Sequence, residues 1–375
     1  MAHRKGLLLL GAASLLLATA GRKELHLATQ QVMAASHNPA DSKTQTQPLK
    51  IERLDPALDN IVPLHATLER VADGFKWTEG PVWIPDGYLL FAEISSNSIR
   101  KLTPAGQASI FMQPSGYKGK TPYGGPEPGS NGMTLDPQGR LTVAGHAQRD
   151  VWRLESLNSH ATATILADSY QGKKLNSPND LVYKSDGSLY FTDPPYGLRT
   201  QGDKDPAKQL DVNGVYRIPG ATSQAPGSQP QRSQLQLLIK DLPRPNGIAF
   251  SPDEHFLYVD SSEPQKIWMR YPVKADGTLG PGKVFFDASS DHRPGGPDGI
   301  KVDRKGNVYS TGPGGIWIFS PEGKHLGTIL LPKVAGNIAW GGADCRTLYI
   351  TMTDTIERIH LKSTGQCFQR KSESR

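Results

Sequence analysis

A short pattern recurs six times along this chain and constrains its fold more than any other feature. Each copy opens a short apolar strand, continues through a turn rich in Asp, Pro or Gly, and ends in a second strand rich in Leu, Tyr and Phe. The copies begin at Gly80, Asn131, Asn179, Asn246, Asp298 and Gly336. A repeat of about 40–50 residues made of strands and turns is typical of a β-propeller. We therefore predict an all-β chain: a six-bladed β-propeller with four-stranded blades around a central channel.

Further segments between the copies supply the rest of each blade. Alternating segments such as Asp150–Leu154 and Gly214–Ile218 predict third strands, and Leu235–Ile239 predicts an outermost strand. The 39 Gly and 30 Pro residues suit a fold that turns often. We expect residues 65–72, just before the first copy, to complete the sixth blade, because this closure leaves the ring no open edge.

The first 20 residues are predicted to be a secretory signal peptide. A basic start at residues 3–5 precedes an apolar run at residues 6–17 and a small-x-small cleavage site at residues 18–20. An uncleaved anchor is the alternative, but the apolar run is short for a bilayer span. We therefore expect a periplasmic or secreted protein with no membrane span after cleavage.

The remaining chain divides into three predicted parts. Residues 21–63 form a flexible N-terminal tether and lead-in, residues 64–362 form the propeller, and residues 363–375 form a C-terminal tail. The net charge of +6 is spread along the chain and does not cluster with aromatic residues. This pattern argues against nucleic acid as a partner. We expect a monomer or a weak dimer.

The chain has two cysteines, Cys345 and Cys367. In an exported protein they could pair and tie the C-terminal segment to the last blade. Nothing in the sequence fixes their separation, so a disulfide and two free thiols both remain open.

The polar residues at the start of the repeat copies should meet at one mouth of the channel. These opening residues are Glu79, Asn131, Asn179, Asn246, Asp298 and Asn337. Any one Asn or Asp here is explained by turn formation alone, but carboxylate and amide oxygens that converge suit a hard divalent cation. The sequence therefore predicts one bound cation, with Ca²⁺ preferred and Zn²⁺, Mg²⁺ and Mn²⁺ as alternatives. The absence of a His/Cys cluster in the sequence argues against zinc.

Six stretches match a known family in the same order along the chain. They are Thr78–Trp83, Ser130–Asp136, Ser177–Val182, Phe191–Gly197, Pro245–Asp253 and Gly296–Ile300. From Leu64 to Leu361 the chain resembles the SMP-30/gluconolactonase/luciferin-regenerating-enzyme-like family, and in particular its bacterial gluconolactonases. Each motif alone is weak, whereas all of them in the right order are specific.

The resemblance implies an axial divalent metal, usually calcium, held by a Glu from the first blade, two Asn and an Asp. The matching positions are Glu79, Asn179, Asn246 and Asp298. Two rival carboxylates, Glu93 and Asp260, follow at the far ends of second strands, where a structural role is favoured. The resemblance also places Asn131, His146, Asn179 and Tyr196 near the substrate, with His146 as a partner of a substrate hydroxyl.

The implied activity is metal-dependent hydrolysis of a sugar lactone, such as glucono-1,5-lactone, to the aldonic acid by a hydrolase that acts on carboxylic esters. The metal would polarise the lactone carbonyl, and Asp298 would act as general base for the attacking water. No Gly-x-Ser-x-Gly motif occurs, which disfavours a serine nucleophile. Two polar loops, residues 113–129 and 200–212, are expected to cover the mouth and to favour a hydroxylated lactone.

Two alternatives from other classes remain open. A related propeller could use the same metal ligands to hydrolyse phosphotriesters or other lactones. A non-catalytic propeller could bind a glycan or a protein partner, because a fold does not fix a function.

Overall fold

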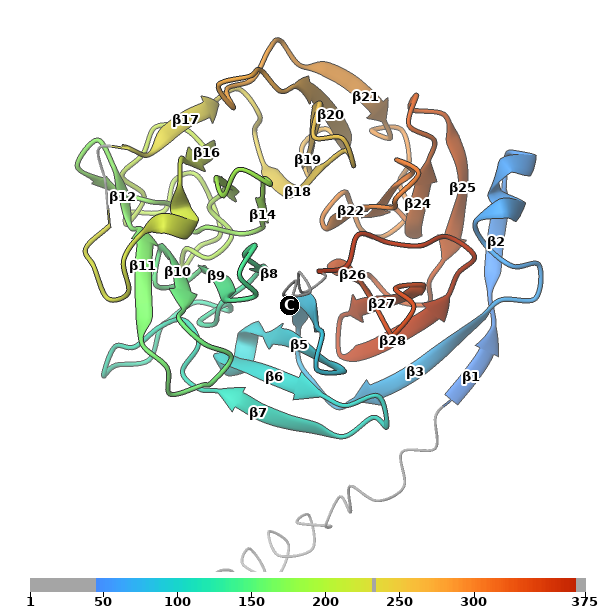
Figure 1. Ribbon diagram of the computed structural model, residues 1–375, viewed down its shortest axis with the longest axis horizontal. Helices are drawn as coiled ribbons and strands as arrows, with labels where there is room; N and C mark the ends of the chain where they lie inside the picture. The colour runs from blue at the N-terminus through green and yellow to red at the C-terminus, as the bar shows by residue number, and fades with distance from the viewer. Residues whose placement is uncertain (1–44, 231–233, 369–375) are drawn as a thin grey trace, which may run out of the picture. The chain divides into compact units, whose positions relative to one another are not determined.

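The computed structural model describes residues 45–230 and 234–368, and these residues form a ring of six β-sheets (Figure 1). The predicted signal peptide lies outside the described residues. The prediction of an all-β, six-bladed propeller is confirmed. Each blade is an antiparallel sheet whose first strand lies nearest the axis, and the inner strands of neighbouring blades contact one another. No helix among the described residues is long and apolar enough to cross a membrane.

The first three blades follow the order of the chain from the axis outward. They are β4 (Thr78–Ile84), β5 (Tyr88–Glu93), β6 (Ser98–Leu102) and β7 (Ala108–Met112); β8 (Met133–Leu135), β9 (Leu141–Gly145), β10 (Asp150–Leu154) and β11 (Ala163–Ala167); and β14 (Leu181–Tyr183), β15 (Leu189–Asp193), β16 (Gly214–Ile218) and β17 (Gln236–Ile239). A small two-stranded sheet, β12 (Ser169–Tyr170) with β13 (Lys173–Lys174), lies between the second and third blades in the chain.

The other three blades repeat this plan. They are β18 (Pro245–Phe250), β19 (Phe256–Ser261), β20 (Ile267–Pro272) and β21 (Lys283–Asp287); β22 (Ile300–Val302), β23 (Val308–Gly312), β24 (Gly315–Phe319) and β25 (His325–Leu330); and β26 (Asn337–Gly341), β27 (Thr347–Met352), β28 (Thr355–His360) and β3 (Thr67–Asp73). Short 3₁₀ turns lie at Pro56–Asn60, Ile94–Ser96 and Ala221–Ser223.

The ring is closed by an N-terminal strand on the last blade, as predicted. Strand β3 pairs antiparallel with β28, which joins residues 67–73 to the C-terminal end of the propeller. Two ion pairs cross this junction, Arg70 with Glu357 at 3.0 Å and Arg358 with Glu69. The closure leaves the sixth blade with the same four strands as the others.

The lead-in adds a fifth strand to two blades, which the sequence did not predict. Strand β1 (Gln45–Pro48) pairs with β3, and β2 (Lys50–Arg53) pairs with β25. All four residues of β1 are exposed. Its sequence, Gln-Thr-Gln-Pro, has no apolar alternation that could mark it as a strand. These additions cover the outer edges of the fifth and sixth blades.

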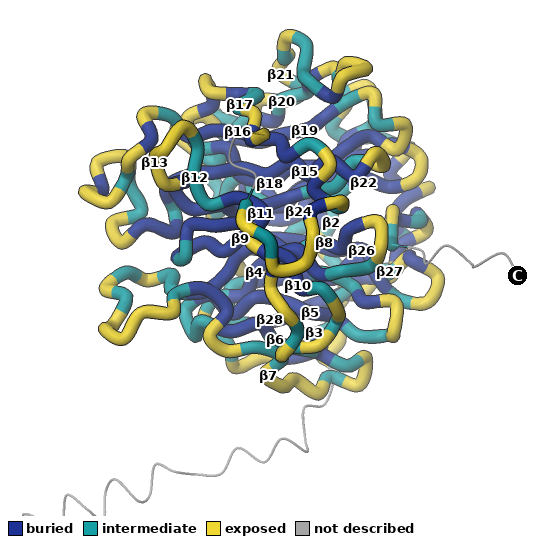
Figure 2. The backbone as a smooth tube through the Cα atoms, turned by 60° about the vertical axis from the view of Figure 1, so that its left-hand side comes forward, coloured by how far each residue is buried: buried dark blue, intermediate teal, exposed yellow. Residues whose placement is uncertain are grey.

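The core lies between the sheets, where dark blue strands run beneath exposed yellow loops (Figure 2). An aromatic cluster joins the fourth and fifth blades, and Trp268 is fully buried in it against Trp317 and Phe319. The indole Nε1 of Trp268 donates a hydrogen bond to Ser310 Oγ at 2.7 Å. This bond satisfies the one polar atom that burial of the indole would otherwise leave unpaired.

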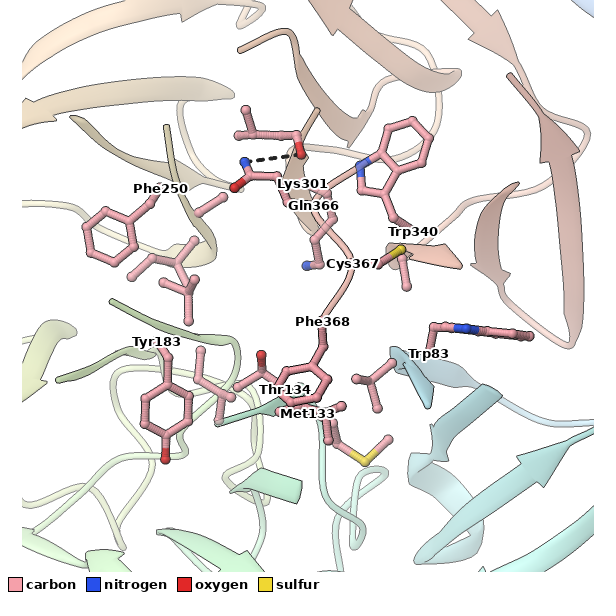
Figure 3. Close-up of a pocket in the computed structure, with 18 of the residues that line it drawn as sticks. Trp83, Met133, Thr134, Tyr183, Phe250, Lys301, Trp340, Gln366, Cys367 and Phe368 are labelled. Carbon is pink, nitrogen blue, oxygen red and sulfur yellow. Dashed lines mark hydrogen bonds between the residues drawn. The ribbon is translucent and has the colours of Figure 1, made fainter. Parts of the chain in front are cut away.

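The C-terminal segment is tied across one end of the channel. Cys345 and Cys367 form a disulfide with a Cα–Cα distance of 6.0 Å, which resolves the two alternatives left open by the sequence. Beside it, Gln366 and Phe368 line a cavity of about 360 Å³ together with residues from the inner strands of all six blades (Figure 3). This cavity lies at the far ends of the inner strands, away from the opening residues.

The turn Asp of the repeat holds its turn together through buried hydrogen bonds. Asp303 is fully buried, and its Oδ1 accepts from the backbone N–H groups of Lys305 and Asn307, both at 2.9 Å. Its Oδ2 accepts from Asn307 Nδ2 at 2.7 Å and from the Tyr309 hydroxyl at 3.0 Å. The Asp of the repeated turn is therefore structural, as expected for a side chain that bonds the backbone ahead of it.

We predict that Asp303→Ala lowers the free energy of unfolding by about 2–4 kcal/mol, because four donors lose their buried acceptor. Asp276→Ala is the matched control, because Asp276 makes similar turn bonds to Thr278 in an exposed turn. That variant should lose less than about 1 kcal/mol. Urea unfolding followed by tryptophan fluorescence measures both, and equal losses would contradict the account.

Candidate active site

The inner strands begin so close to the axis that the backbones of neighbouring blades touch. The N–H of Gly132 donates to Asn179 O at 2.7 Å, and the N–H of Gly299 donates to Gly336 O at 2.9 Å. A Cβ on Gly132 would lie 2.5 Å from Asn179 O, which no side chain tolerates. The Gly after an opening residue is therefore required by this close approach between blades.

This approach brings five opening residues to one cavity at the channel mouth. The cavity has a volume of about 390 Å³, and its lining includes Glu79, Asn131, Asn179, Asn246 and Asp298. Each of the five precedes or begins the inner strand of one of the first five blades. All but Asp298 are at most 5% exposed, and Asp298 is partly exposed.

Two of these residues are carboxylates that repel each other. Burial, together with the nearby charges of Asp180 and Glu127, raises the pKa of Glu79 to about 8. Burial also raises the pKa of Asp298 well above its ordinary value, and repulsion from Glu79 and Asp260 adds to this effect. Among the described residues, no Lys or Arg forms an ion pair with Glu79 or Asp298. The two carboxylates are thus ionised at neutral pH only at a cost.

Two amide oxygens at the same mouth lack partners. Asn131 Oδ1 and Asn246 Oδ1 are buried, and neither accepts a hydrogen bond. Asn246 donates from Nδ2 to Ser262 Oγ at 3.0 Å, which fixes the orientation of its amide. A buried oxygen without a donor is costly and rare in folded proteins. A positive charge at the mouth would satisfy these oxygens and the carboxylates together.

The donor set fits a hard divalent cation. Carboxylate and amide oxygens are the ligands that Ca²⁺ and Mg²⁺ take. In the described part of the chain, no three His, Cys, Asp or Glu side chains gather around one point that could hold a metal. A cation at this mouth would therefore depend on the Asn oxygens, which is the pattern that the sequence predicted.

The other predicted site residues lie around this cavity. Tyr196 lines it, and the Arg244 guanidinium lies 5.5 Å from the Tyr196 ring centroid. His146 is fully buried beside it and does not line it. Asn337 from the sixth blade lies within the channel, where its Nδ2 donates to Asp180 Oδ2 at 3.4 Å. The functional roles predicted for these residues and for the proposed ligands stay predictions.

The two rival carboxylates face elsewhere. Glu93 forms an ion pair with Arg100 at 2.6 Å, in keeping with the structural role favoured from the sequence. Asp260 is fully buried behind the mouth, where its Oδ1 accepts from the N–H of Gly247 at 2.9 Å. Burial raises the pKa of Asp260 well above its ordinary value. Neither side chain lines the cavity.

Three further charged residues line the cavity, and the sequence assigned none of them an individual role. Glu127 from the loop at residues 113–129 lines the cavity, as do Glu263 and Lys266 from the fourth blade. The two loops also touch, because Gln201 Nε2 donates to Glu127 Oε1 at 2.8 Å. The sequence indicated two polar loops at the mouth, but no motif distinguishes Glu127 from the other polar residues of its loop.

Comparisons with known proteins agree with this arrangement. The profile of the SMP-30/Gluconolactonase/LRE-like region matches residues 77–354. A gluconolactonase from Zymomonas mobilis is 37% identical over 333 residues, which cover 84% of this chain and 87% of that protein. A 6-deoxy-6-sulfogluconolactonase from Pseudomonas putida is 37% identical over 123 residues, or 32% of this chain and 41% of that protein.

Comparison with solved structures also finds gluconolactonases. The structure of a gluconolactonase from Xanthomonas campestris superposes with a TM-score of 0.68 at 30% identity, covering 84% of this chain and 95% of that one. The residues matched by the family profile contain every opening residue and the inner strands of all six blades. This chain belongs to the SMP-30/gluconolactonase/LRE-like family.

Proposed function

We propose that this chain hydrolyses a sugar lactone, such as glucono-1,5-lactone, to the aldonic acid with the help of one divalent cation. The observation that carries the proposal is the cavity at the channel mouth, where two repelling carboxylates and two unpaired amide oxygens converge. The prediction that the chain is an enzyme, a hydrolase of carboxylic esters, is confirmed by its gluconolactonase relatives.

Glu79, Asn179, Asn246 and Asp298 are the residues that would hold the cation. Ca²⁺ is the preferred ion, because amide oxygens and only two carboxylates form a weakly charged oxygen shell. When bound, the ion would act as a Lewis acid on the lactone carbonyl and stabilise the negative charge that develops there. Zn²⁺, Mg²⁺ and Mn²⁺ are the alternatives.

Asp298 is the residue that would take the proton of the attacking water at a carboxylate oxygen. Glu79 is less free to do so, because its Oε2 accepts from the N–H of Gly80 at 3.1 Å. No described residue donates a hydrogen bond to the Asp298 carboxylate. The Asn amides are not basic, so they can orient water and sugar hydroxyls but cannot accept the proton.

Asn131, Asn179 and Tyr196 line the cavity and are proposed to contact the sugar, whereas His146, which does not line it, would act on the sugar through a neighbouring side chain. The polar loops at residues 113–129 and 200–212 support a hydroxylated lactone. Phosphotriester hydrolysis and glycan binding would use the same mouth, and a panel of substrates separates them from lactone hydrolysis.

Export to the periplasm or the medium is part of the proposal, and the disulfide supports it because disulfides persist in oxidising compartments. A monomer or weak dimer remains the expected state.

We predict that purified protein releases acid from glucono-1,5-lactone in a pH-indicator assay with Ca²⁺, and that a chelator stops the reaction. Asp298→Asn should lower kcat by about 10²–10⁴-fold, because it removes the general base. The variant is assayed at a Ca²⁺ concentration that saturates it, as measured by calorimetry. The control Asp276→Asn lies in an exposed turn and should retain full activity.

Two results would contradict this mechanism. Hydrolysis that continues in excess chelator would exclude the role of the cation. An Asp298→Asn variant that is saturated with Ca²⁺ and turns over at the wild-type rate would exclude the general base. Hydrolysis of a phosphotriester such as paraoxon in preference to every aldonolactone would favour the alternative activity.

We predict that metal-free protein loses stability as the pH rises from about 4.5 to about 8. Burial raises the pKa of folded Glu79 from 4.5 to about 8, so the folded state keeps a proton that the unfolded chain has lost. This contribution is present below pH 4.5 and is lost as the pH reaches the folded pKa. Urea midpoints in chelator should therefore fall more steeply for the wild type than for Glu79→Gln.

Calcium should change this profile. The ion binds the ionised carboxylates, so its stabilising effect should grow with pH in the wild type and be weaker in Glu79→Gln. Glu322→Gln is the control, because Glu322 lies in the exposed turn between β24 and β25 of the fifth blade. Identical pH profiles for the wild type and Glu79→Gln in chelator would show that Glu79 carries no raised pKa.

A further inference from the structure

One carboxylate of the mouth comes from a loop rather than from a blade. Glu127 lines the same cavity as the opening residues, and its side chain is 18% exposed. It is not among the proposed cation ligands.

Glu127 is held from two sides by side chains of different parts of the fold. Gln201 Nε2, from the second loop, donates to Glu127 Oε1 at 2.8 Å. His146 Nε2, at the end of the second blade's β9 strand, lies 2.8 Å from Glu127 Oε2. The carboxylate is therefore fixed in place although its loop has no regular secondary structure.

The orientation of His146 is itself fixed. Its Nδ1 lies 3.0 Å from Pro178 O, and a carbonyl oxygen can only accept, so Nδ1 carries a hydrogen. The ring is fully buried. Its only other polar contact among the described residues is the one between Nε2 and Glu127 Oε2. His146 thus supports Glu127 from behind and does not reach the cavity.

The two bonds leave Glu127 with acceptor positions to spare. An ionised carboxylate offers about four lone-pair positions, two on each oxygen. Gln201 donates to Oε1, and His146 donates from Nε2 to Oε2 when its ring carries a hydrogen on both nitrogens, so each contact occupies one position on one oxygen. One position on each oxygen then remains, and this pair suits two adjacent hydroxyl groups, which donate in parallel to a carboxylate.

We propose that Glu127 determines specificity by accepting hydrogen bonds from adjacent hydroxyls of the substrate ring, and that His146 and Gln201 are its positioning residues. The inference rests on the proposed function and deepens it, because it assigns the choice of polyhydroxylated over unsubstituted lactones to one side chain. His146, predicted from the sequence to contact a substrate hydroxyl, would then act on that hydroxyl indirectly, by positioning Glu127.

The test compares two lactones that differ in their hydroxyl groups. Glu127→Ala should lower kcat/KM for glucono-1,5-lactone by roughly 10–100-fold, mostly through KM, because a hydrogen bond to a charged group is lost. It should change kcat/KM for δ-valerolactone, which has no hydroxyls, by less than about 2-fold. Asp211→Ala is the matched control, a loop carboxylate whose side chain is 89% exposed, and should change neither.

The positioning role is tested by a double-mutant cycle. His146→Ala should reproduce the KM defect of Glu127→Ala, and the double variant should lose little more, because both changes remove one unit. His146→Gln keeps a donor and should restore part of the selectivity. If His146 only supports the fold, the kcat/KM losses of the two single variants multiply in the double variant, and His146→Ala lowers hydrolysis of δ-valerolactone as much as that of glucono-1,5-lactone. This result would overturn the positioning role.

A binding measurement separates this inference from the proposed activity. Methyl β-glucopyranoside carries ring hydroxyls but no lactone, so calorimetry reports recognition without hydrolysis. Its affinity should be at least about 10-fold weaker for Glu127→Ala than for the wild type. A wild type that hydrolyses no lactone would refute the proposed function alone, whereas equal glucoside affinity in both proteins, or equal losses on both lactones, would overturn the role of Glu127.

Discussion

The close approach of neighbouring blades at the axis is the constraint on which the rest of the structure depends. Gly132 donates to Asn179 O in the next blade, Thr192 Oγ1 donates to Asn246 O at 2.7 Å, and Gly299 donates to Gly336 O. These bonds run between blades, and each is accepted by a residue that lies at the start of an inner strand. They set both the tightness of the ring and the place where the opening side chains meet.

The same approach creates an electrostatic problem that a cation would solve. Blades packed this tightly bury carboxylates and amide oxygens side by side, with raised pKa values on Glu79 and Asp298 and no donor for Asn131 Oδ1 or Asn246 Oδ1. Each of these features costs stability in the absence of a ligand. By contrast, the turn carboxylate of Asp303 is fully hydrogen-bonded and needs no further partner.

Much of the fold followed from the sequence because its repeat carries a physical signal. Apolar alternation and Asp/Gly turns locate the strands, and the need to avoid an open edge predicts the closure by residues 65–72, which β3 confirms. Strand β1 escaped prediction because it is polar and exposed throughout. The pairing of Cys345 with Cys367 could not be decided, because sequence separation does not fix a distance in space.

The site was predictable to the extent that it belongs to the repeat. Five opening residues share one cavity because each holds the same place in its blade. Glu127 and its contact with His146 join a loop to another blade, and no periodicity encodes such a contact. The chemical roles of all these residues depend on a ligand, and the sequence pattern alone does not supply one.

The most direct test of the central claim is a crystal structure of the protein soaked with Mn²⁺, with data collected at a wavelength where manganese scatters anomalously. The account predicts one strong anomalous peak at the channel mouth, within about 2.0–2.6 Å of side-chain oxygens of Glu79, Asn179, Asn246 and Asp298. A mouth without a peak, or a peak held by other residues, would contradict it.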